Sequence, residues 1–68
     1  MYFNSKLFKK HFKIAKSTRT LDMLLPEVKI GLFALQRFEQ GKVEDEVMSD
    51  YWEVCKWMGK SPLVYFVN

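Results

Sequence analysis

The chain has 68 residues, of which 49% are hydrophobic and 16% aromatic, and its formal net charge is +3 at pH 7. A chain of this length forms one domain, and its single cysteine excludes an internal disulfide and a cysteine-rich zinc site. Its longest apolar run near the end, from Leu63 to Val67, is far too short to cross a bilayer. We therefore expect a single small domain over residues 1–68, stabilised by good packing or by association with another chain.

Positive charge is concentrated near the N-terminus. Residues 1–19 contain six basic side chains and no acid, whereas the rest of the chain contains five basic side chains and all eight acids. This asymmetry is typical of proteins that contact nucleic acid or a membrane surface. The unpaired cysteine fits a reducing compartment, and the first residues lead into lysines rather than into the apolar run of a secretory signal. We expect a cytoplasmic protein.

The first predicted element is an amphipathic helix over residues 4–16, with Asn4 or Ser5 as its N-cap. At about 100° per residue, lysines and apolar side chains separate onto opposite sides. The apolar side, which we expect to face the core, consists of Phe3, Leu7, Phe8, His11, Phe12, Ile14 and Ala15. The polar side consists of Lys6, Lys9, Lys10, Lys13 and Lys16.

The central segment predicts a second helix over residues 20–40 with a break near Pro26. Proline fits the first turn of a helix better than its interior, so a short helix over 20–25 should lead into a longer one over 26–40. Thr18 or Thr20 can cap its start, and Gly41 can end it. Apolar residues cover more than half of its circumference, so we expect it to be buried on most sides.

Residues 43–58 predict a third main helix that ends at Gly59, with Glu46, Asp50 and Glu53 forming a solvated acidic face. The final residues, SPLVYFVN, favour an extended backbone. This segment could lie across the helices, pair with the N-terminal MYF, or pair with a partner chain. The predicted fold is all-α: a compact bundle of three main helices (4–16, 20–40 and 43–58) with a short extended C-terminal segment.

The sequence offers few groups that could carry chemistry. Cys55 and His11 are the only cysteine and histidine, and both fall on apolar helix faces, where a buried thiol is inert. The GKS at residues 59–61 lacks the earlier glycine of a phosphate-binding loop and precedes a proline. The acidic face has no histidine to complete a metal site. We therefore expect no enzyme, no catalytic residue, no metal, no cofactor and no small-molecule substrate.

Two classes of macromolecular partner remain. The first is a small non-enzymatic binding protein, a regulator, inhibitor or accessory factor, that docks on a protein partner or self-assembles. Trp57 falls outside the main apolar arc of its helix, and tryptophan is a favoured interface residue. The candidate protein interface consists of Trp52, Trp57, Leu63, Val64, Tyr65 and Phe66. The tryptophans and the C-terminal segment could equally pack over the domain's own core.

The alternative is a nucleic-acid-associated protein that uses the lysine side of the N-terminal helix. Lysines neutralise phosphates, but the lysine side of this helix has no arginine, asparagine or glutamine to read base edges, so we expect no strong sequence readout. The candidate anion-binding face consists of Lys6, Lys9, Lys10, Lys13, Lys16 and Arg19. The same lysines would also suit a merely solvating surface. Membrane binding is disfavoured because the core needs the apolar side of this helix.

Overall fold

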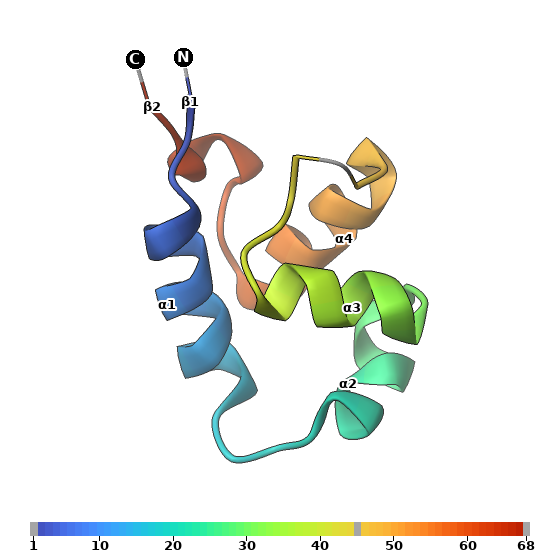
Figure 1. Cartoon of the computed structure of the whole chain (residues 1–68). Helices are drawn as coiled ribbons and strands as arrows, with labels where there is room; N and C mark the ends of the chain where they lie inside the picture. The colour runs from blue at the N-terminus through green and yellow to red at the C-terminus, as the bar shows by residue number, and fades with distance from the viewer. Residues whose placement is uncertain (1, 45, 68) are drawn as a thin grey trace.

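The computed structural model describes residues 2–44 and 46–67. The described chain is mostly helical, with one short strand at each end (Figure 1). Its elements in order are β1 (Tyr2–Phe3), α1 (Ser5–Lys16), α2 (Leu21–Val28), α3 (Leu32–Glu39), α4 (Met48–Met58), the 3₁₀ turn η1 (Pro62–Tyr65) and β2 (Phe66–Val67). In Figure 1, α1 runs down one side of the view, α3 crosses the middle below α4 and above α2, and the two chain ends lie side by side. No helix in these two described ranges is both long enough and apolar enough to cross a bilayer.

Helix α1 forms where the sequence predicts it. The side chain of Asn4 accepts a hydrogen bond from the Leu7 amide at 3.1 Å, which satisfies one of the amides that the first turn leaves unpaired. Phe8 and Phe12 are buried, as expected. Ile14 is 66% exposed, so its assignment to the core was wrong. It lies well round the helix from Phe8 and Phe12, beside Lys10, and only a narrow strip of α1 faces the other elements.

The central segment forms two separate helices, and the prediction of one helix with a break near Pro26 was wrong. Pro26 lies inside α2. Leu24 and Val28 are completely buried one turn apart, so the helix has to continue through the proline to bring both into the core. The chain breaks instead at Lys29, whose backbone is left-handed (φ 63°), and at Gly31, which precedes α3.

The last main helix is shorter than predicted, because α4 begins at Met48 and not at residue 43. Gly41, with φ at 79°, ends the preceding helix region as expected, and Gly59 ends α4. Between them Val43 is buried without being helical. Residue 45, which the predicted helix included, lies outside the described residues. The bundle therefore has four helices in its described part rather than three main ones.

The C-terminal segment pairs with the N-terminus, one of the three arrangements that the sequence left open. Strands β1 and β2 are antiparallel, with Tyr2 opposite Val67 and Phe3 opposite Phe66. A two-stranded pair is only marginally stable by itself. Here the rings of Phe3 and Phe66 both lie against Tyr51 of α4, with centroids 5.9 and 6.0 Å away. Packing on α4 therefore holds the two chain ends together.

The core is built largely from aromatic rings contributed by both ends of the chain. Phe8 of α1 and Tyr65 of η1 are completely buried, and their ring centroids lie 5.2 Å apart in an edge-on arrangement. Such edge-on pairs stabilise beyond the area that they bury. The buried side chains are Phe3, Phe8, Phe12, Leu24, Val28, Ala34, Leu35, Phe38, Val43, Tyr51, Val54, Cys55 and Tyr65.

Candidate binding surfaces

A groove of about 510 Å³ runs along the lysine side of α1. We call it the lysine groove. It is lined by Lys6, Lys9, Lys10, Phe12, Lys13, Lys16 and Glu39. The sequence predicted that the five lysines share one side of a helix, but the groove also depends on the approach of α3. The structure thus brings five of the six candidate anion-binding residues together in one concave surface.

Close packing between α1 and the end of α3 shapes one wall of the lysine groove. A Cβ at Gly41 would come within 2.7 Å of the Lys9 side-chain carbons, so the stem of Lys9 lies directly over this glycine. Lysine commonly covers apolar surface with its methylenes while its amine stays in water. Lys9 is exposed overall, which fits this arrangement.

The charge in the lysine groove is strongly one-sided. Lys6, Lys9, Lys10 and Lys13 are exposed, and Glu39 is the single acid in the groove lining among the residues that the structure describes. Glu39 Oε2 lies 3.6 Å from Lys16 Nζ at one end, where the Lys16 side chain is only 23% exposed. Within residues 2–44 and 46–67, Lys16 is the one groove lysine with an ion-pair partner. Four amines therefore face solvent together.

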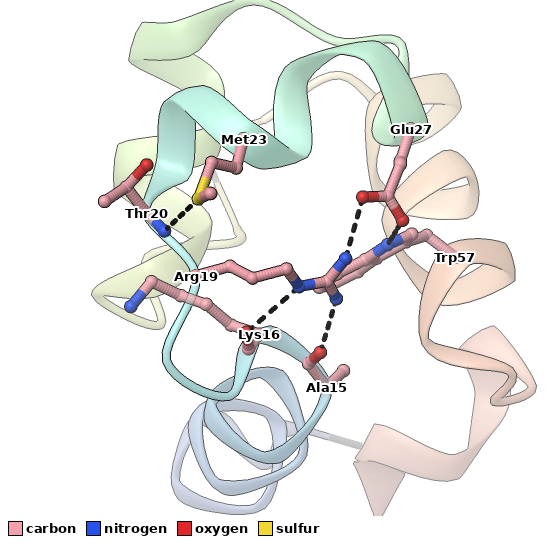
Figure 2. Close-up of polar contacts among 7 residues, drawn as sticks. All are labelled: Ala15, Lys16, Arg19, Thr20, Met23, Glu27 and Trp57. Atoms are coloured by element: carbon pink, nitrogen blue, oxygen red, sulfur yellow. Dashed lines mark hydrogen bonds and ion pairs between the residues drawn. The ribbon is translucent and has the colours of Figure 1, made fainter.

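Arg19 does not belong to the lysine groove, although the sequence placed it on the same face. Its guanidinium donates to the carbonyl oxygens of Ala15 and Lys16 at 2.8 and 3.3 Å, which satisfies the last turn of α1 (Figure 2). The same group donates to Glu27 at 2.7 Å and lies 5.7 Å from the Trp57 ring centroid. Arg19 thus joins α1, α2 and α4, and this structural role occupies its guanidinium.

The candidate protein interface divides into buried and exposed members. Tyr65 is completely buried, so its assignment to an interface was wrong. Trp57 is half-buried: its ring lies 5.6 Å from that of Phe12, and its indole nitrogen donates to Glu27 at 3.4 Å. Phe66 is half-buried against the core. The sequence left open whether these two residues pack over the core or face a partner, and the structure packs both partly against the core.

Three members of the candidate interface do face solvent. Trp52, Leu63 and Val64 are 53%, 72% and 45% exposed. Met48, the first residue of α4, is 59% exposed and lies one turn before Trp52.

A small pocket of about 210 Å³ lies between the paired strands and the start of α4. Its lining is largely apolar, with two acids at its edge. The lining residues are Phe3, Val43, Glu44, Glu46, Met48, Tyr51 and Phe66. Glu46 forms an ion pair with Arg37 and its side chain is only 4% exposed, so its assignment to a solvated acidic face was wrong. Glu46 precedes α4 and pairs with Arg37 of α3, so its carboxylate is directed toward α3 and not toward solvent.

The polar groups of His11, Tyr51 and Tyr65 each have a hydrogen-bond partner. His11 Nδ1 and the Tyr65 hydroxyl form a hydrogen bond of 2.9 Å, and the Tyr51 hydroxyl donates to the Pro62 carbonyl. Burial raises the pKa of Tyr65 to about 12, and it also raises the pKa of Tyr51 and of the Cys55 thiol above their ordinary values. These groups are therefore protonated at pH 7, and a protonated thiol is a poor nucleophile.

The described part of the chain gathers no group of three or more histidine, cysteine, aspartate or glutamate side chains that could hold a metal ion. Comparison with protein-family models, with curated proteins and with solved structures found no match. The arguments about function therefore rest on the surfaces themselves, and the lysine groove is the most distinctive of these surfaces.

Proposed function

We propose that this protein is a small non-enzymatic binding protein that docks on an anionic macromolecule through the lysine groove. The observation that carries the proposal is that, in the part of the chain that the structure describes, five lysines and one acid line one concave surface. These five positive charges exceed the net charge of the whole chain, which is +3. The remaining surface carries most of the acids, so the molecule is electrostatically polarised, and this polarity would orient an approaching anion.

The shape of this surface favours docking over simple solvation. A solvating lysine face needs only separate amines in water, whereas here the lysine stems and α3 enclose a groove. A concave surface lined by one sign of charge on low-dielectric walls focuses the field and concentrates counter-ions. The exposed amines of Lys6, Lys9, Lys10 and Lys13 are therefore placed to act together on one partner.

Docking on a protein through apolar side chains remains a prediction, with fewer candidate residues than before. Of the original set, Trp52, Leu63 and Val64 are exposed on the surface of the folded chain. An acidic protein surface would also suit the lysine groove, as would Asp50 and Glu53 of a second copy of this chain. A role as regulator, inhibitor or accessory factor is compatible with either kind of partner.

We expect loss of three groove lysines to weaken polyanion binding roughly 100-fold, at about 1 kcal/mol for each lysine near an anionic surface. The variant is Lys9→Gln, Lys10→Gln and Lys13→Gln, and the measurement is the dissociation constant for fluorescein-labelled heparin. The matched control is Lys29→Gln, Lys56→Gln and Lys60→Gln, which changes three exposed lysines outside the groove and leaves the same net charge. We expect this control to bind almost as tightly as the unmodified protein.

Equal losses in the two variants would contradict the proposal, because binding would then follow net charge and not the groove. Thermal unfolding of both variants separates lost binding from lost folding. A double variant, Lys10→Gln and Lys13→Gln, spares the Lys9 stem that packs on Gly41, and it tests the groove even if the triple variant is unstable.

A further inference from the structure

We infer that the anionic partner is the phosphate backbone of a nucleic-acid duplex, bound without readout of base sequence. This inference rests on the proposed function and adds the chemistry of the partner. It is carried by three features of the lysine groove: its length, its lack of every donor except amines, and the burial of its one aromatic side chain.

The length of the lysine row suits a duplex. Lys6 and Lys16 are ten positions apart on a regular helix, which corresponds to about 15 Å along α1. Each strand of a duplex carries a phosphate about every 3.4 Å along the axis. A band of amines of this length along one side of a helix can therefore contact several phosphates of one backbone at once. Flexible lysine stems can adjust to the spacing without a fixed register.

The donor chemistry favours phosphate over a protein partner. Protein interfaces are depleted in lysine, and their binding energy comes mainly from tryptophan, tyrosine and arginine. The groove lining contains no arginine, and the nearby Arg19 is occupied by Glu27 and by carbonyls of α1. Its one aromatic residue, Phe12, is only 1% exposed and cannot anchor a partner side chain. The binding mode that this lining still allows is electrostatic contact between lysine amines and phosphate groups.

The same lining argues for a duplex and against a single strand. Proteins that bind single strands stack the bases on exposed aromatic side chains, and Phe12 is covered. The planar arginine, asparagine and glutamine side chains that read base edges in a fixed geometry are absent from the groove lining within residues 2–44 and 46–67. Lysine can contact guanine, but its flexible point charge suits the phosphate backbone, so we expect this surface to follow the backbone of a duplex with little discrimination between sequences.

Glu39 lies at one end of the lysine groove, and we expect its negative charge to weaken duplex binding. Its carboxylate repels phosphate and neutralises Lys16 through their 3.6 Å contact. Glu39→Gln removes both effects, so we expect it to tighten duplex binding several-fold while the groove variants weaken it. General damage to the fold would weaken binding, so a variant that binds more tightly shows an effect that is specific to the groove.

The test is a fluorescence anisotropy titration with two labelled DNA duplexes of unrelated sequence, a single strand and a polyglutamate peptide. We expect equal affinity for the two duplexes. With four to five phosphate contacts, affinity should fall roughly 150- to 500-fold between about 50 and 200 mM salt. Replacing Lys9, Lys10 and Lys13 by Gln should reduce the slope of log affinity against log salt by about 2.7, whereas the control triple variant should keep the slope.

Each outcome bears on the inference. If the protein binds polyglutamate through the groove lysines but does not bind either duplex, the inference of a duplex partner is wrong, and the proposed function still holds. Absence of binding to heparin, duplex and peptide alike overturns both. Tighter binding of the single strand, or a strong difference between the two duplexes, overturns backbone-only recognition. Equal binding of both duplexes, loss in the groove variants and gain in Glu39→Gln support it.

Discussion

We expect the Phe8→Ala variant to lose most of the folding stability of this protein. Phe8 is completely buried. Its ring centroid lies between 5.2 and 6.2 Å from those of Phe3, Phe12, Phe38, Tyr51 and Tyr65. Removing a buried phenylalanine costs about 3–5 kcal/mol, and a domain of this length has roughly 3–10 kcal/mol in total. Thermal unfolding followed by circular dichroism should show a midpoint roughly 12–40 °C lower, or no folded state at all.

Phe33→Ala is the matched control, because it removes the same side chain from the surface. Phe33 is 74% exposed on α3, so its loss should change the free energy of unfolding by no more than about 0.5 kcal/mol. Similar melting temperatures for Phe8→Ala and the unmodified protein would contradict the arrangement of the core around Phe8.

A chain that ends at Ser61 should not fold. The missing residues include Tyr65, which is completely buried and whose backbone carbonyl accepts a hydrogen bond from Asn4 at 2.6 Å. They also include the Pro62 carbonyl, which pairs with the Tyr51 hydroxyl, and the strand that covers Phe3. Loss of a buried aromatic ring alone costs about 3–5 kcal/mol. Far-ultraviolet circular dichroism should therefore show little helix and no cooperative thermal transition.

The control for this truncation keeps the whole chain and changes only the exposed side chains of the same segment. Leu63→Ala with Val64→Ala should leave the melting temperature within a few degrees, because these residues are 72% and 45% exposed. A cooperative transition in the truncated chain would show that the segment is an appendage. Tyr65 and Phe66 would then become interface candidates again.

Local signals predicted the first helix well. Asn4 caps α1, and the burial of Phe8 and Phe12 opposite the lysines follows from periodicity alone. Gly41 and Gly59 end their helix regions with a positive φ, where glycine carries no steric penalty. In each case the residues that decide the structure lie within one or two turns of each other, so the sequence contains the necessary information.

Long-range packing accounts for the errors. Pro26 disfavours a helix locally, yet burial of Leu24 and Val28 on one side outweighs the loss of one hydrogen bond. The C-terminal segment looks free in sequence, but Tyr65 fills the space beside Phe8, 57 positions earlier in the chain. A helical wheel gives the angle of a residue around its own helix and not which elements will approach it.

The candidate site, like the fold, was predictable from the sequence only where it depends on a single helix. The shared side of the five lysines is visible in the sequence, since it depends on one helix only. Their enclosure into a groove needs α3 and the contact between Gly41 and Lys9, which no local pattern indicates. The exclusion of Arg19 depends on Glu27 and Trp57 of two other helices. The charge pattern in the sequence therefore predicted which helix side forms the surface. The tertiary contacts determine that this surface is concave and which residues line it.

The most direct test of the lysine groove is to map amide chemical-shift changes by ¹⁵N nuclear magnetic resonance while a DNA duplex is added to the labelled protein. We predict that the largest changes fall on residues 6–16 and on the neighbouring residues 39–41, in proportion to the bound fraction. Salt should reverse them. Changes centred on Trp52, Leu63 and Val64, with α1 unaffected, would contradict the lysine groove as the docking surface.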